Sequence, residues 1–197
     1  MAGVVQLKPP PLSVDIFRTF VAGRPEEERW ELIDGVAVMR APLTIAHQQI
    51  ASNLQRILHD ALERRALAMT PFQRVGVNLG PAIENYDPEP DVVVIDSAAA
   101  QDPDEHYAGR FYLAAEVVSP SDAAMVEAKR EVYKRHAACT CILTVQQSRC
   151  EVRVDLRTDA GWTQQVLNKP DNVLVLADFG LSCTVADVYR GTALRPR

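Results

Sequence analysis

Two apolar segments of the chain place the strongest constraint on its fold. They are DVVVID at residues 91–96 and YLAAEVV at residues 112–118. Short continuous apolar runs of this kind are typical of strands that are buried on both faces in the middle of a sheet. Each segment nevertheless carries an acid, Asp91 in the first and Glu116 in the second.

An ionised carboxylate at Glu116 needs a compensating partner. Its neighbours are all apolar, and burying an unpaired charge among them costs several kcal/mol. If the two strands are neighbours in the sheet, Asp91 and Glu116 repel each other unless a divalent cation lies between them. Alternatively, Asp91 is a strand-start cap and Glu116 pairs with one arginine. Because carboxylates with waters are what Mg²⁺ or Mn²⁺ prefers, the two acids together favour a metal site.

The segment that follows Glu116 predicts a helix, introduced by the serines of SPS and running to about His136. At about 100° per residue, Lys129 falls about 40° from Met125, within the apolar arc that includes Val132 and Tyr133. The solvated face is predicted to hold Glu127, Arg130, Glu131 and Lys134. Lys129 is thus the inward cation, which either extends along the apolar surface to reach solvent or points at the two acids.

An inward lysine beside two acids is the combination that metal-dependent phosphodiester hydrolysis requires. The metal lowers the pKa of a bound water and stabilises the transition-state charge. The lysine orients or deprotonates that water and offsets negative charge.

Two further polar residues lie near predicted element boundaries. Asp34-Gly35 between short apolar runs predicts a hairpin that follows Glu31. Glu31 either belongs to the site or simply pairs with Arg24 or Arg40. A long helix capped by Thr44 carries His47 in its first turn, where histidine is more often a surface or capping residue than a functional one.

Several stretches, in this order, resemble the Uma-two type family of restriction endonucleases, within the PD-(D/E)XK nuclease superfamily. They are WELIDGVAVM, AHQQIASNLQRIL, PEPDVVVID, AAEVVSPSD and KREVYKRH, between roughly residues 28 and 146. The resemblance implies an α/β (α+β), restriction-endonuclease-like fold with a mixed central β-sheet flanked by α-helices. It also implies a catalytic set of Asp91, Glu116 and Lys129, with Glu31 as an additional acid. The metal ligands would be Asp91, Glu116 and the backbone carbonyl of Val117.

The chain departs from the superfamily motif at two places. The motif places its lysine two residues beyond the acid, where this chain has Val118, but Uma-two type sequences commonly take the lysine from the following helix. That helix lacks the arginines and aspartate that many relatives carry at its start. Arg130 and Lys134 therefore remain alternatives to Lys129.

Length and composition set the remaining expectations. The 197 residues, of 21.8 kDa, predict a single domain over 1–197, with a helical lead-in at 1–27, a nuclease core at 28–146 and a β-rich part at 147–197. The net charge of −5 does not favour a strong nucleic-acid binder. No apolar stretch approaches the roughly 20 residues of a membrane span, and the N-terminus lacks the pattern of a secretory signal, so a cytoplasmic protein is expected.

The sequence thus predicts a Mg²⁺-dependent endodeoxyribonuclease, with Mn²⁺ as a possible substitute and DNA as substrate. A homodimer is expected, because cutting two antiparallel strands is simplest with a two-fold pair of sites. Two alternatives stay open: a non-catalytic nucleic-acid or protein-binding module on the same scaffold, and a structural dimerisation domain.

Overall fold

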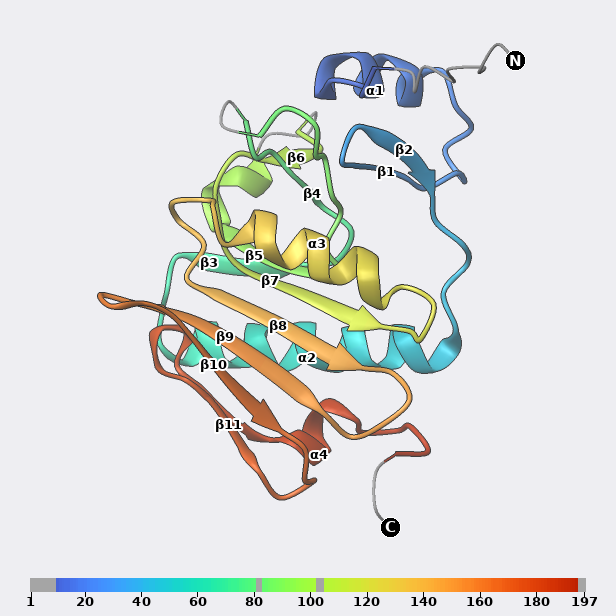
Figure 1. The fold of residues 1–197 in the computed structure, drawn as a ribbon. Coiled ribbons are helices and arrows are strands. Elements are labelled where there is room, and N and C mark those ends of the chain that lie inside the picture. The colour runs from blue at the N-terminus through green and yellow to red at the C-terminus, as the bar shows by residue number, and fades with distance from the viewer. Residues whose placement is uncertain (1–9, 81–82, 102–104, 195–197) are drawn as a thin grey trace.

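A six-stranded mixed sheet forms the centre of the computed structural model, which describes residues 10–80, 83–101 and 105–194 (Figure 1). The strand order is β10-β9-β8-β7-β5-β3. The parallel pair is β7 with β8, and the other neighbours are antiparallel. The strands are β3 (Met69–Phe72), β5 (Val92–Asp96), β7 (Phe111–Val118), β8 (Cys141–Gln146), β9 (Val152–Thr158) and β10 (Gly161–Leu167). The predicted mixed central sheet is confirmed.

Both faces of the middle strands are covered, which explains their continuous apolar sequences. Figure 1 shows α2 (Ile45–Arg64) and α3 (Ala123–Tyr133) on opposite faces of the sheet. Val92 and Ala115 belong to the hydrophobic cluster that includes residues of α2. Val93 and Ala114 belong to the cluster that includes residues of α3. Glu116, an even-numbered step from Ala114 along β7, therefore faces α3.

Helix α2 begins where the sequence predicts and packs an apolar face against the sheet. The Thr44 side chain accepts a hydrogen bond of 3.1 Å from the backbone N–H of His47 and so caps the helix. Ile50, Leu54 and Leu58 are each at most 1 % exposed. Their spacing of four residues places them on one face of the helix, against the sheet.

A separate hairpin, β1 (Trp30–Ile33) with β2 (Val36–Met39), carries Glu31. Both turn residues have positive φ, 50° at Asp34 and 73° at Gly35, as the predicted Asp-Gly turn requires. A two-residue bridge attaches the hairpin to the loop before β5: Leu32 N–H donates to the Asp87 carbonyl at 3.3 Å, and Asp87 N–H donates to the Leu32 carbonyl at 2.9 Å. This bridge brings Glu31 close to Asp91.

The remaining elements lie around the sheet. They are α1 (Val14–Ala22), β4 (Gly76–Val77) paired in parallel with β6 (Tyr107–Ala108), the short turns η1 (Ser97–Gln101) and η2 (Ala177–Phe179), β11 (Val173–Leu176) paired with β12 (Leu181–Thr184), and α4 (Val185–Val188). In the part of the chain that the structure describes, no helix combines the length and apolar character needed to cross a bilayer.

Helix α3 differs from its prediction at both ends. Asp122, rather than a serine, occupies the N-cap position, and its carboxylate accepts hydrogen bonds from Ser119 Oγ at 2.8 Å and Ser121 Oγ at 3.1 Å. The serines therefore bind the cap residue instead of the helix N–H groups. The helix ends at Tyr133, before His136, with Lys134 as its C-cap.

Candidate active site

Asp91 and Glu116 lie next to each other at one end of the central strands. Val92 of β5 is in register with Ala115 of β7 in an antiparallel pair. Asp91, which precedes Val92, therefore lies opposite Glu116, which follows Ala115. Asp91 Oδ2 accepts a hydrogen bond of 2.8 Å from the backbone N–H of Val117. Asp91 Oδ1 lies 2.9 Å from Nε2 of His47, on α2. Both oxygens of Asp91 are thus held in place by groups on neighbouring elements.

Glu116 is bound from the opposite face by two side chains of α3. Lys129 Nζ lies 2.7 Å from Glu116 Oε1, and the Tyr133 hydroxyl donates to the same oxygen at 2.7 Å. Lys129 and Tyr133 are one helical turn apart, which places both side chains on one face of α3. In the structure, as predicted, the Lys129 side chain points inward, toward the acids.

Glu31 completes the ring of charges around Lys129. Its Oε1 lies 2.7 Å from Lys129 Nζ and accepts a second hydrogen bond, also of 2.7 Å, from the backbone N–H of Glu89. Its Oε2 lies 3.2 Å from Arg40 Nε. The sequence offered Arg24 or Arg40 as a partner of Glu31 if Glu31 lay outside the site. In the structure Glu31 pairs with Arg40 and also with Lys129.

The charges at the centre shift one another's pKa. Burial raises the pKa of Glu116 to about 7; Lys129 opposes this rise, while Asp91 and Glu31 add to it. Burial alone lowers the pKa of Lys129, but the Glu116 and Glu31 carboxylates outweigh it and raise that pKa above its ordinary value. Lys129 is therefore an ammonium ion in this arrangement.

Asp91 and Tyr133 show opposite shifts. Burial raises the pKa of Asp91, but the contact with His47, the Lys129 charge and the Val117 N–H together bring it below its usual value. Burial and the Glu116 carboxylate raise the pKa of Tyr133 well above 10. Asp91 is consequently ionised near neutral pH, and Tyr133 is a hydrogen-bond donor.

The two cations that the sequence offered in place of Lys129 lie elsewhere. Arg130 was expected on the solvated face of α3, but it is buried and donates to Asp155 of β9, with 2.7 Å between Nε and Oδ2. Lys134 Nζ lies 3.7 Å from the same aspartate. The expectation for Arg130 was wrong because its partner is a buried acid on a later strand.

The oxygen atoms at the centre suit a small hard cation. In the described ranges, no group of three or more His, Cys, Asp or Glu side chains is arranged to hold a metal. Mg²⁺ commonly uses only one or two carboxylates and keeps several waters, so Asp91 and Glu116 fit its requirements. Lys129 and Tyr133 both approach Oε1 of Glu116, which leaves Oε2 as the oxygen for a metal. The Val117 N–H points at Asp91, and the N–H and carbonyl of one residue in a strand point toward the same neighbouring strand. The Val117 carbonyl is therefore on the Asp91 side of β7.

Three residues at the centre were underestimated or missed from the sequence. His47 was weighed as a surface or capping residue, Arg40 only as a partner of Glu31, and Tyr133 only as part of an apolar face. All three are buried or mostly buried and contact the acids. A phenol on the same helical face as an inward lysine is the one signal that was available for Tyr133.

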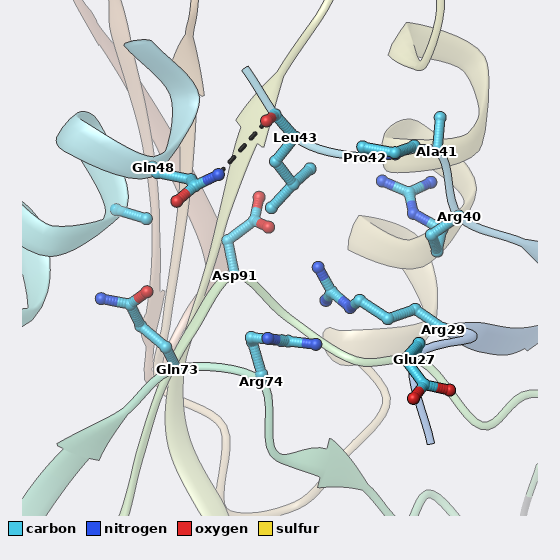
Figure 2. Close-up of a pocket in the computed structure, with 11 residues that line it drawn as sticks. Glu27, Arg29, Arg40, Ala41, Pro42, Leu43, Gln48, Gln73, Arg74 and Asp91 are labelled. Carbon is cyan, nitrogen blue, oxygen red and sulfur yellow. Dashed lines mark hydrogen bonds between the residues drawn. The ribbon is translucent and has the colours of Figure 1, made fainter. Parts of the chain in front are cut away.

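A cavity of about 380 Å³ opens beside Asp91. Figure 2 shows the side chains of Arg29, Arg40 and Arg74 directed into this space, with Gln48 and Gln73 on its far side from Arg29 and Arg40. Asp91 therefore lies at the wall of a solvent-accessible pocket that is rich in guanidinium groups.

Comparisons with known proteins identify the fold and the family of the chain. One solved structure is that of a putative nuclease belonging to DUF820 from Anabaena variabilis ATCC 29413. It superposes with a TM-score of 0.70 at 15 % sequence identity, covering 91 % of this chain and 98 % of the other. This similarity supports the predicted restriction-endonuclease-like fold. No curated protein matched the sequence. The model of the Uma2 family, described as "Putative restriction endonuclease", matches residues 16–186, and the chain therefore belongs to the Uma2 family.

Proposed function

We propose that the protein is a Mg²⁺-dependent endonuclease that hydrolyses phosphodiester bonds of DNA. The observation that carries this proposal is that Lys129 Nζ lies 2.7 Å from both Glu116 and Glu31. Asp91 lies beside Glu116 at the same end of the central strands. Family membership supports a nuclease, and the divalent metal, the DNA substrate and the residue roles are the parts that need testing.

Asp91 and Glu116 would hold the cation, with the Val117 carbonyl as a third ligand. When bound, the cation would lower the pKa of a nearby water and offset charge on the scissile phosphate. Mn²⁺ prefers similar oxygen ligands and would substitute for Mg²⁺. Glu31, which touches Lys129 rather than the proposed cation, would fix the position of the ammonium group.

Lys129 would orient the attacking water and stabilise the developing negative charge. The ammonium form has no lone pair, so it cannot accept the proton of the water. The sequence left open whether Lys129 orients or deprotonates the water, and we propose that it orients the water. His47 would keep Asp91 directed at the cation, and Tyr133 would do the same for Glu116.

Cleavage assays with matched variants test this function. Purified protein is incubated with single-stranded and duplex DNA and RNA, with Mg²⁺, Mn²⁺ or EDTA. We expect divalent-dependent cleavage of DNA, reduced by at least about 100-fold in Asp91→Asn and Glu116→Gln. Glu63→Gln, at an exposed position near the end of α2, is the matched control and should cleave normally. Cleavage that is equal in all variants would come from a contaminant and would refute the proposal.

The alternative of a non-catalytic binding module on the same scaffold is separated by calorimetry. A nuclease of the proposed kind binds Mn²⁺ through Asp91 and Glu116, and Glu116→Gln weakens that binding. A module without a metal site gives no heat of binding in either protein. The homodimer remains a proposal, which sedimentation of the free and DNA-bound protein addresses directly.

A further inference from the structure

The cavity beside Asp91 carries more positive charge than the catalytic centre uses. Arg29, Arg40 and Arg74 all line it, and their side chains come from different segments of the chain (Figure 2). Arg40 already serves Glu31, at 3.2 Å. Among the described ion pairs, Arg29 and Arg74 contact Glu89 and neither Glu31 nor Glu116.

Arg29 and Arg74 instead share one carboxylate. The guanidinium of Arg29 pairs with Glu89 Oε1, and Nε of Arg74 lies 3.7 Å from the same oxygen. The Glu89 side chain is 21 % exposed, that of Arg29 17 %, and that of Arg74 59 %. An anionic oxygen thus already lies between two guanidinium groups at the edge of a cavity, where the Arg74 side chain is largely exposed and that of Arg29 is mostly buried.

The backbone of Glu89 connects this arginine pair to the catalytic centre. Its N–H donates to Glu31 Oε1 at 2.7 Å, and its carbonyl lies 3.5 Å from Lys129 Nζ. Asp91 follows two residues later, so the Cα atoms of Glu89 and Asp91 are at most about 7 Å apart. A ligand held by Arg29 and Arg74 therefore lies close to a phosphodiester bound at Asp91.

The arginine pair also borders another cavity. A second cavity, of about 690 Å³, has Arg29 and Arg74 in its lining together with Trp30 and Tyr107. Arg29 and Arg74 therefore border both cavities. A DNA strand that extends from the Asp91 cavity toward the second cavity would therefore pass this arginine pair.

We propose that Arg29 and Arg74 form a subsite for a backbone phosphate of DNA adjacent to the bond that is cut. Guanidinium groups bind phosphate oxygens through paired, charge-assisted hydrogen bonds, and the phosphate replaces the Glu89 carboxylate between them. The inference rests on the proposed function, since it places this phosphate relative to the catalytic centre. It adds the residues that position the DNA strand.

The test measures binding apart from cleavage. A short fluorescein-labelled DNA duplex is titrated with the full-length protein in Ca²⁺, at several salt concentrations, and binding is followed by fluorescence anisotropy. The variants are Arg29→Gln, Arg74→Gln and the double variant. The control is Arg64→Gln, an exposed arginine on α2 that lies 17 positions beyond His47, or roughly 25 Å along the helix axis.

We expect each single variant to weaken binding by about 3- to 10-fold and to reduce the slope of log affinity against log salt by about one. The double variant should show about a 10- to 100-fold loss. Arg64→Gln should bind like the unmodified protein. A purely structural role of the arginines would lower the melting temperature without changing the salt slope of the folded protein.

The outcomes separate this inference from the proposed function. If the protein cleaves DNA with divalent metal but the double variant keeps the original affinity and salt slope, the subsite is wrong and the nuclease stands. If no variant or substrate shows cleavage but the double variant still loses affinity and slope, the phosphate subsite stands and the nuclease is wrong. If the protein binds no DNA at all, the subsite is refuted.

Discussion

Lys129 Nζ lies 2.7 Å from Glu116 Oε1, although the lysine is on α3 and the glutamate is on β7. The superfamily motif that this chain resembles has both residues on one strand, with the lysine two residues beyond the acid. Here that position holds Val118, a buried core residue. The helix thus supplies the charge at a point where the strand supplies packing. The same lysine also reaches Glu31 on the hairpin, so it joins three separate elements.

Removal of the Lys129 charge should cost more stability than removal of the whole charged pair. Lys129→Met leaves the buried Glu116 without its cation and leaves Arg40 as the cation beside Glu31, and we expect it to lower the free energy of unfolding by about 3–5 kcal/mol. Adding Glu116→Gln to Lys129→Met should restore part of that loss. Urea unfolding at pH 7 gives the free energies of the original protein, the two single variants and the double variant. Simple additivity of the two single effects would contradict the direct contact.

His47→Gln should weaken metal binding although His47 is not proposed as a ligand. The imidazole lies 2.9 Å from Asp91 Oδ1 and orients that carboxylate. Loss of such a supporting group typically costs about 10- to 100-fold in metal affinity or activity. Calorimetry with Mn²⁺ gives the affinity, and cleavage assays give the activity.

The matched control for that change is His59→Gln on the same helix. His59 is half-exposed and lies 3.3 Å from the exposed Glu63, so its replacement should leave metal affinity unchanged. Equal affinities of the His47 and His59 variants would remove His47 from the proposed site.

Gly35→Ala should destabilise the hairpin that carries Glu31. Gly35 has φ of 73°, and a Cβ there would lie 2.2 Å from Cβ of Pro11. We expect a loss of about 1–3 kcal/mol in unfolding free energy, together with reduced activity as Glu31 moves. Gly109→Ala is the control, because a Cβ at that position meets no atom within 4 Å. Thermal melts of the two variants give the comparison, and equal melting temperatures would count against a strained contact at Gly35.

His136 should make the protein less stable in mild acid. Burial lowers the pKa of His136 below its ordinary value of 6.5, and Arg157 and Arg110 act in the same direction, against the hydrogen bond to the Gly109 carbonyl. The unfolded chain therefore takes up a proton at a higher pH than the folded protein does. Above about pH 7.5 this histidine contributes no pH dependence, and its share of stability is lost as the pH falls through 6.5 toward the lower folded pKa.

Urea unfolding of the original protein and of His136→Phe at several pH values isolates that share. The ring of His136 stacks on Phe111 with 4.3 Å between centroids, and phenylalanine keeps this contact without titrating. The stability difference between the two proteins should change in favour of the variant as the pH falls. A difference that is constant with pH would show that His136 titrates alike in both states.

Local sequence patterns predicted the elements that support the site, because each pattern reports burial of neighbouring residues. The segment around Val93 and the segment around Ala114 became central strands, and the Asp34-Gly35 pair became the turn of a hairpin. The i, i+4 stripe that begins at Ile50 became the inner face of α2. Each of these features depends on residues that are close together in the chain.

Features that depend on distant partners were not visible in this way. Arg130 looked like a surface residue because its acid, Asp155, lies on β9 and only the sheet brings the two together. The sequence from residue 66 to residue 80 reads as one extended, interrupted strand, but the structure divides it between two sheets, because β3 pairs with β5 and β4 pairs with β6. His47 was underestimated for the same reason, since its contact with Asp91 spans two elements.

The hairpin, the strands and α3 each contribute to the centre, and their order along the chain has a practical consequence. Glu31 and Asp91 precede the connection between β5 and β6, whereas Glu116 and Lys129 follow it. A chain divided at that connection would separate the four residues into two pairs. Neither fragment alone would contain both carboxylates of the proposed metal site, so recovered cleavage would report that the two fragments had recombined.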